Sequence, residues 1–137
     1  MEIPELQKII FVEDDPEIQD IVTMSLVDIG GFKLDVYSCA KELFLNVFKY
    51  RPHLFLLDIN LPDMDGFTIL KKLRSFPQYS ATPVVFITAN PFRYEMMDKM
   101  DEKVLGTISK PFDAINISEN LKILWKNYHI NNEIKHC

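Results

Sequence analysis

The chain has 137 residues, about the length of one ordinary domain. Its composition, 47% hydrophobic and 26% charged, is that of a globular protein and excludes a disordered chain. A formal net charge of −5 argues against a nucleic-acid-binding surface built on bulk charge. Only two cysteines occur, which excludes a disulfide framework. The N-terminus has no leader pattern and the chain has no long apolar run, so neither a signal peptide nor a membrane span is expected. We expect a single cytoplasmic domain without nucleic-acid or membrane partners.

Short apolar runs alternate five times with longer amphipathic segments along the chain. The runs predict strands at Lys8–Val12, Phe32–Tyr37, Leu54–Leu57, Val84–Thr88 and Val104–Ser109. The third run, LFLL, and the fourth, VVFIT, are almost wholly hydrophobic. This pattern is typical of strands that are buried on both faces of a parallel sheet.

Helices are predicted in the segments between and after these strands. Asp15 and Pro16 form a helix start, because Asp caps free N–H groups and Pro suits the first helical position; Gly30 and Gly31 end this helix. Further helices are expected at Ala40–Tyr50, Gly66–Phe76, Arg93–Met100 and from near Asp113. The last helix carries its apolar side chains on one side, at Ile117, Leu121, Leu124, Trp125 and Tyr128. Residues 130–137 are expected to form a frayed tail.

Five successive β-α units predict an α/β fold with a doubly wound parallel sheet and helices on both faces, joined by right-handed crossovers. Ligands bind to such folds at the carboxyl ends of the strands, near the topological switch point. The residues that follow each predicted strand are therefore the first candidates for a functional site.

Polar residues stand at four of these strand ends. They are Glu13, Asp14 and Asp15 after the first strand, Asp58 after the third, Thr88 at the end of the fourth and Lys110 after the fifth. Clustered carboxylates repel one another unless a counter-charge is present. A hard divalent cation, Mg²⁺ with Mn²⁺ as a substitute, suits such oxygen ligands and often shares a phosphate group.

Asp58 is the best candidate for a nucleophile, because it directly follows a fully apolar run that would fix its position. Beside a metal ion and a lysine, a carboxylate can attack a phosphoryl donor and form an acyl phosphate. Thr88 and Lys110 would contact the phosphoryl oxygens. Each residue also has a simpler interpretation alone: the acidic triplet as a helix start, Asp58 as a loop carboxylate and Lys110 as a solvated lysine. The whole set at the ends of one sheet favours the functional interpretation.

Four segments in this order resemble the receiver domain of two-component response regulators, particularly stand-alone receivers of the chemotaxis type. They read IIFVEDDPEI, LFLLDINLPDMDGF, PVVFITA and ISKPFD. The resemblance covers about residues 7–128. It implies a flavodoxin-like (βα)5 three-layer sandwich with strand order 2-1-3-4-5 and a receiver domain over residues 1–129. As a departure from many members of the family, no output domain is expected after residue 129.

The resemblance also implies a role for each matching residue. Asp58 corresponds to the phospho-acceptor, Asp14 to the direct Mg²⁺ ligand and Glu13 to its acidic neighbour. Asn60 would offer its backbone carbonyl to the metal. Thr88 resembles the switch hydroxyl and Lys110 the lysine that pairs with the phosphoryl group, which assigns the catalytic roles to Asp58, Thr88 and Lys110.

The chain departs from the family pattern on the face that receivers commonly present to partners. Thr107 occupies a position, three before the lysine, where the family often has an aromatic residue. The preceding MDEKVLGTI is also unusual, so the fourth helix is expected to be short or shifted. The partner face would contain Thr107 together with Met96, Met97 and Met100.

The leading hypothesis is a phosphorylation-dependent signalling switch that catalyses only its own phosphorylation and dephosphorylation. Its partners would be a histidine kinase or histidine phosphotransfer protein and a downstream protein, with the chain a monomer or a phosphorylation-dependent dimer. A receiver-like binding module that works without phosphorylation is one alternative. A haloacid dehalogenase-type phosphatase is another, but Asn60 replaces the second acid that this chemistry needs.

Overall fold

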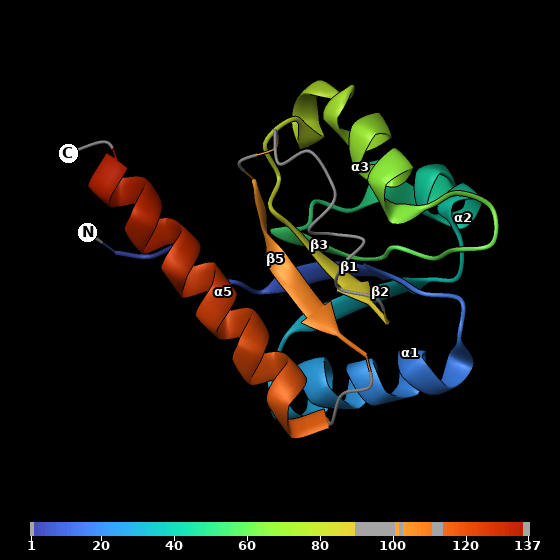
Figure 1. The fold of residues 1–137 in the computed structure, drawn as a ribbon, viewed down its shortest axis with the longest axis horizontal. Helices are drawn as coiled ribbons and strands as arrows, with labels where there is room; N and C mark the ends of the chain where they lie inside the picture. Colours follow the sequence, from blue (N-terminus) through green and yellow to red (C-terminus); the bar gives the residue numbers. More distant parts are fainter. Residues whose placement is uncertain (1, 90–100, 102, 111–113, 136–137) are drawn as a thin grey trace.

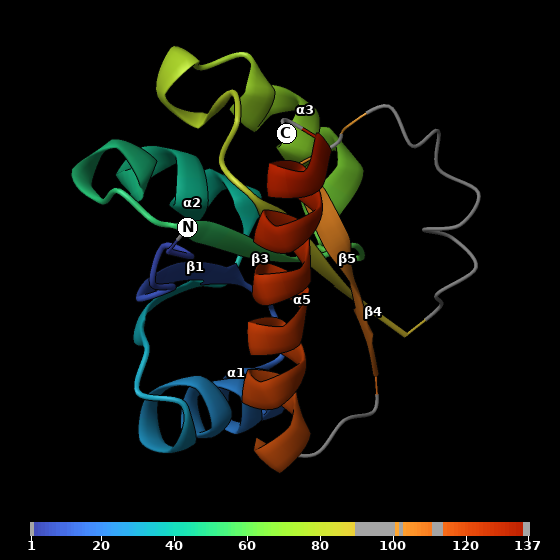
Figure 2. The same cartoon turned by 90° about the vertical axis from the view of Figure 1, so that its left-hand side faces the viewer.

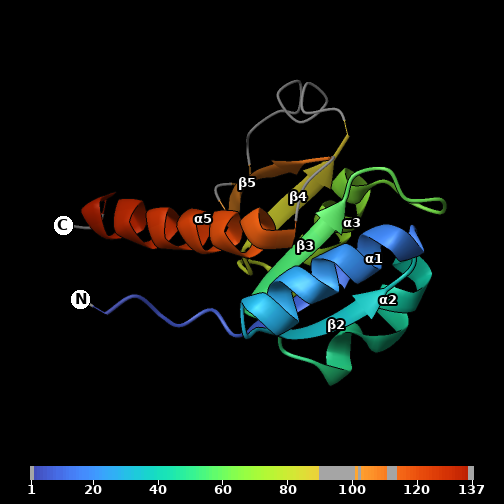
Figure 3. The same ribbon diagram turned by 90° about the horizontal axis from the view of Figure 1, so that it is seen from below.

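The computed structural model describes residues 2–89, 101, 103–110 and 114–135, and the side chains of this set up to residue 132. Five parallel strands form one sheet in the order β2-β1-β3-β4-β5 (Figure 1, Figure 3). They are β1 Lys8–Val12, β2 Lys33–Tyr37, β3 Leu54–Asp58, β4 Val84–Thr88 and β5 Val104–Ser109. The predicted α/β class, parallel sheet and strand order are confirmed.

Helices cover both faces of the sheet. They are α1 Pro16–Thr23, α2 Ala40–Asn46, α3 Gly66–Arg74 and α5 Ala114–Lys135. The helices α1 and α5 lie on one face, and α2 and α3 lie on the other (Figure 1). Figure 2 shows the first turns of α5 beside α1. No helix among the described residues is both long and apolar enough to cross a membrane.

The alternation of side chains along β3 explains why two separate cores form. Leu54 and Leu56 point into the core beneath α1 and α5, whereas Phe55 and Leu57 point into the core beneath α2 and α3. All four side chains are fully buried, as the near-continuous hydrophobic run predicts. Asp58 ends this strand and is therefore fixed at the edge of both cores.

The first helical region departs from the predicted single helix. Helix α1 begins after the Asp15 cap and Pro16, as expected, but Met24–Ile29 continues it as a π-helical segment. Gly31 ends the segment with a φ of +75°, a conformation that glycine adopts without strain. Phe32, predicted to begin β2, instead donates its N–H to the carbonyl of Leu26, so the strand starts one residue later.

The other corrections concern helix ends. Helix α2 changes at Asn46 to a 3-10 turn, Val47–Lys49, and α3 ends at Arg74, two residues before the predicted end. The predicted tail from residue 130 is wrong as far as Lys135, because α5 continues through it. No Gly or Pro interrupts residues 114–135, so nothing in the local sequence stops the helix. The predicted helix Arg93–Met100 lies outside the described residues.

Candidate functional site

The site lies at the edge where the carboxyl ends of β1, β3, β4 and β5 meet. Asp58 is the last residue of β3, and Glu13 directly follows β1, the neighbouring strand. Both carboxylates are buried; Asp58 is only 2% exposed. Asp14 is exposed beside them. The sheet therefore brings residues 45 positions apart into one cluster with access from solvent.

One carboxylate oxygen from each of Glu13, Asp14 and Asp58 lies within 4.8 Å of the other two. Within the described part of the chain, these three residues meet the geometric requirement for a metal-binding group. An all-oxygen set with one exposed member is a donor set that hard cations such as Mg²⁺ prefer. The grouping predicted from the strand ends is therefore present. Asp15 lies next to this group but caps α1, accepting from the N–H of Glu17 at 2.9 Å.

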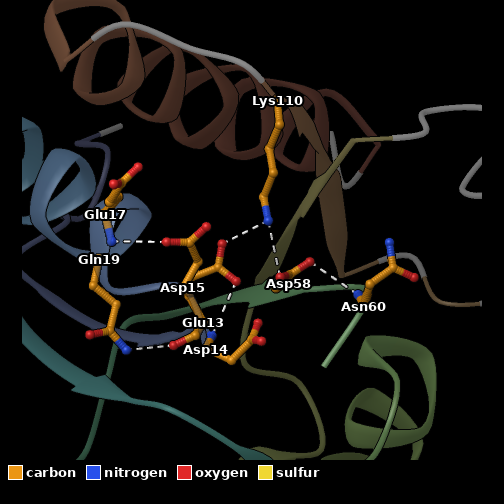
Figure 4. Close-up of polar contacts among 8 residues, drawn as sticks. All are labelled: Glu13, Asp14, Asp15, Glu17, Gln19, Asp58, Asn60 and Lys110. Atoms are coloured by element: carbon orange, nitrogen blue, oxygen red, sulfur yellow. Dashed lines mark hydrogen bonds and ion pairs between the residues drawn. The ribbon is translucent and has the colours of Figure 1, made fainter. Parts of the chain in front are cut away.

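Lys110 supplies a positive charge to the same cluster. Its Nζ lies 2.7 Å from Oε1 of Glu13 and 3.1 Å from Oδ2 of Asp58 (Figure 4). The backbone N–H of Lys110 donates to the carbonyl of Thr88 at 2.8 Å, which anchors this lysine to the end of β4. The lysine is thus held between two buried carboxylates by the β4–β5 pairing as well as by charge.

The electrostatics of the cluster follow from burial and from charge. Burial and the neighbouring Asp58 raise the pKa of Glu13 to about 8, although Lys110 acts in the opposite direction. Burial alone would lower the pKa of Lys110, but the carboxylates of Glu13 and Asp58 hold it above its ordinary value. The cluster therefore carries more negative charge than one lysine can balance when all its carboxylates are ionised.

The loop after β3 orients the Asp58 carboxylate. The backbone N–H of Asn60 donates to Oδ1 of Asp58 at 3.0 Å, so the two carboxylate oxygens have different partners. The loop then turns back, and the N–H of Gly66 donates to the carbonyl of Ile59 at 2.9 Å. A Cβ at Gly66 would stand 2.7 Å from the Asp58 carbonyl oxygen, so this close approach requires glycine.

Thr88 is fully buried at the end of β4, beside the strand that carries Asp58. Thr107 is half-buried on β5 and pairs with Phe86 of β4. The other predicted partner-face residues, Met96, Met97 and Met100, lie outside the described residues.

Gln19 is a part of the site that the sequence analysis missed. Its side-chain amide donates to the carbonyl of Glu13 at 2.6 Å and to Oγ of Ser38 at 3.2 Å. It therefore ties the acidic loop to both α1 and the end of β2. Gln19 lies one helical turn after the Asp15 cap, but no motif distinguishes it from an ordinary surface glutamine.

A model of the response regulator receiver domain matches residues 9–122. Response regulator Rre1 of Synechocystis is 32% identical over 105 residues, which cover 77% of this chain and 46% of that protein. Transcriptional regulatory protein TrcR of Mycobacterium tuberculosis is 30% identical over 127 residues, and the aligned region covers 90% of this chain and 47% of that protein. The chain spans about half the length of the first curated relatives that it matches.

Solved structures also resemble this chain, among them a response regulator and a sensor protein. Chemotaxis response regulator CheY4 of Vibrio cholerae superposes with a TM-score of 0.75 at 25% identity, covering 88% of this chain and 99% of its own. A sensor protein from Polaromonas gives a TM-score of 0.78 at 26% identity, with 89% and 98% covered. The matched residues 9–122 include the acidic cluster, the strands β2 to β5 and all of β1 except Lys8. The chain belongs to the response regulator receiver domain family.

Proposed function

We propose that this receiver domain is a phosphorylation-dependent switch in which Asp58 accepts a phosphoryl group. The observation that carries the proposal is the position of Lys110, whose ammonium group contacts both Asp58 and Glu13. Receiver domains are signalling modules of two-component systems, and an intact acidic cluster with its lysine is what acceptor chemistry requires.

The reaction is a phosphoryl transfer to a carboxylate. An oxygen of Asp58 attacks the phosphorus of a phosphohistidine or of a small acyl phosphate, and the P–N or P–O bond to the donor breaks. The product is an acyl phosphate on Asp58. The ammonium group of Lys110 lies beside the attacking carboxylate and would balance charge that develops on the phosphoryl oxygens.

Glu13, Asp14 and Asp58 would hold Mg²⁺, with the backbone carbonyl of Asn60 as a further oxygen ligand. The oxygen-only donor set fits this ion, as does the excess of carboxylates over ammonium groups in the cluster. When bound, the ion would neutralise negative charge on the phosphoryl group. Gln19 would position this arrangement by fixing the Glu13 backbone.

Thr88 is proposed as the hydroxyl that responds to the new phosphoryl group. It stands at the end of β4, the strand that pairs with β3, and its neighbour on the sheet edge is Lys110. A response at Thr88 would pass to β5, where Thr107 replaces the aromatic residue common in the family. The switch would bias a pre-existing equilibrium, which takes only a few kcal/mol.

The donor is proposed to be a histidine kinase or a histidine phosphotransfer protein. The receiver signals through a downstream protein, as a monomer or as a phosphorylation-dependent dimer. Several relatives are transcriptional regulators, so the expectation of no nucleic-acid partner applies at most to the surface of this domain.

The test is intact-mass spectrometry after incubation with acetyl phosphate, with and without Mg²⁺. The wild-type chain should gain one phosphoryl adduct only with Mg²⁺, and Asp58→Asn should gain none. Asp20→Asn is the matched control, because Asp20 is an exposed acid of α1 outside the cluster. If Asp58→Asn is labelled at the wild-type level, another residue must be the phospho-acceptor. No adduct on the folded wild-type chain, together with no beryllofluoride binding, would favour the phosphorylation-independent binding module.

A further inference from the structure

Helix α2 and the turn that follows it carry two apolar faces, whereas a surface helix normally carries one. Leu43 and Val47 are fully buried against the sheet. Phe44, Leu45 and Phe48 form a second stripe with helical spacing on another side. Leu45 is 69% exposed and Phe48 is 54% exposed. The second stripe thus leaves large apolar side chains open to solvent.

The second stripe borders a groove of about 330 Å³ between α2, α3 and the loop that follows β3. The groove, here called the α2–α3 groove, has an apolar part and a charged part. Its lining includes Phe44, Leu45 and Met64, with Lys41, Lys72 and Asp63 around them. A hollow of this size accepts side chains from a bound segment, as grooves for amphipathic helices do.

The carboxylate of the groove is already engaged by α2. Oδ1 and Oδ2 of Asp63 accept hydrogen bonds from the N–H groups of Ala40, at 3.1 Å, and Lys41, at 3.0 Å. Burial acts to raise the pKa of Asp63, but these hydrogen bonds outweigh it and hold the pKa below its ordinary value. Asp63 therefore serves as the cap of α2, and its charge meets the positive end of the helix.

The two lysines of the groove are available to a partner. Within the described residues, the ammonium groups of Lys41 and Lys72 form no ion pair with a carboxylate. The Nζ atom of Lys72 lies 4.3 Å from the centre of the Phe44 ring, so its positive charge is placed over an apolar side chain of the groove. On a chain with a net charge of −5, this groove combines apolar surface with local positive charge.

We propose that the α2–α3 groove docks a short acidic amphipathic segment of a partner protein. Leucine or aromatic side chains of the segment would cover Leu45 and Met64, and its carboxylates would pair with Lys41 and Lys72. Charge complementarity selects this occupant, because two lysine ammonium groups border the groove while the carboxylate of its lining is engaged by α2. The helices that line the groove, α2 and α3, lie on the face of the sheet opposite α5 (Figure 1).

The test measures fluorescence anisotropy of a labelled peptide of roughly fifteen residues, with Leu and Phe on one helical face and Glu on the other. A companion peptide carries Lys in place of Glu. The acidic peptide should bind the full chain at least about tenfold more tightly than the companion. Leu45→Glu and Lys72→Glu should each weaken its binding by about tenfold or more.

Two residues of α5 provide matched controls. Ile123 and Lys126 are exposed on the opposite face of the sheet, and Ile123→Glu and Lys126→Glu repeat the same changes in charge. Both should bind the acidic peptide within about twofold of wild type. Far-UV circular dichroism checks folding; if Leu45→Glu fails to fold, Lys72→Glu decides the test alone.

Three outcomes would overturn the proposal. They are equal binding of both peptides, equal loss of binding in the α5 controls, and a concentration-dependent dimer in sedimentation that Lys72→Glu abolishes. The last would identify the occupant as a second copy of the chain. Every measurement is made without Mg²⁺ or a phosphoryl donor, so the result is independent of whether Asp58 can be phosphorylated.

Discussion

Replacement of Lys110 by Met removes the ammonium group that contacts two buried carboxylates and retains most of the apolar stem. At an effective dielectric constant of about 20, the contacts of 2.7 Å with Glu13 and 3.1 Å with Asp58 correspond to gross Coulomb energies of about 6 and about 5 kcal/mol when both carboxylates are ionised. Much of this attraction offsets the cost of burying the three charges. The net effect of the substitution must therefore be far smaller than the gross energies.

The expected loss of unfolding free energy is about 2–3 kcal/mol near neutral pH without divalent cations. Breaking a buried pair costs about 3–5 kcal/mol, but the Lys110 side chain is 18% exposed and water screens part of its charge. Glu13 limits the loss further, since its pKa of about 8 with Lys110 present leaves it largely protonated at pH 7, where Lys110 pairs mainly with the Asp58 carboxylate. The loss should consequently grow as pH rises from 7 to 9.

Urea unfolding followed by the fluorescence of Trp125, the single and largely buried tryptophan, measures this loss. With an m-value of about 2 kcal/mol/M, the midpoint should fall by about 1 M. Lys126→Met, at an exposed site on α5, is the control and should change stability by less than about 0.5 kcal/mol. A Lys110→Met midpoint equal to wild type, at pH 7 and at pH 9, would refute the role of Lys110 as the counter-charge.

Three further predictions concern stability, metal binding and pH. Gly66→Ala should cost about 1–3 kcal/mol in the same urea assay, because the new Cβ would meet the Asp58 carbonyl oxygen; an unchanged midpoint would contradict the close approach. Asp14→Asn should weaken Mg²⁺ binding by about tenfold or more in a fluorescence titration, and unchanged affinity would remove Asp14 from the ligand set. Burial and Lys103 lower the pKa of His129, so the folded state resists its protonation and stability should fall as pH drops below 6.5. His129→Phe should reduce this slope between pH 7 and pH 5, and an unaltered slope would assign it to other groups.

The sheet was predictable because hydrophobic runs and strand ends are encoded locally. The LFLL and VVFIT runs identify two strands that are buried on both faces. Asp58 after the first run and Thr88 at the end of the second mark the sheet edge that carries the candidate site. The helix ends were less predictable, since tertiary contacts decide them. The N–H of Ser118 in α5, for example, donates to the Ser25 hydroxyl in the π-helical segment, a contact between residues 93 positions apart that no local pattern indicates.

The candidate site was predictable in its members but not in its contacts. Topology alone places Glu13, Asp58 and Lys110 at one edge, because parallel strands carry their carboxyl ends to the same side. Their pairing depends on side-chain direction, and the sequence offers no signal for it. Gln19 and Asp63 were missed for the same reason: each contacts a segment that is adjacent only in the folded chain.

The loop between Asp58 and Gly66 connects the acidic cluster to the α2–α3 groove through hydrogen bonds at two points. At one end, the Asn60 N–H holds Oδ1 of Asp58. Further along, Asp63 holds the first turn of α2, whose next residues line the groove. A change in the direction of the Asp58 carboxylate must therefore either break the Asn60 hydrogen bond or move this loop. Because Asp63 is fixed to α2, movement of the loop would alter the groove without any contact between the two sites.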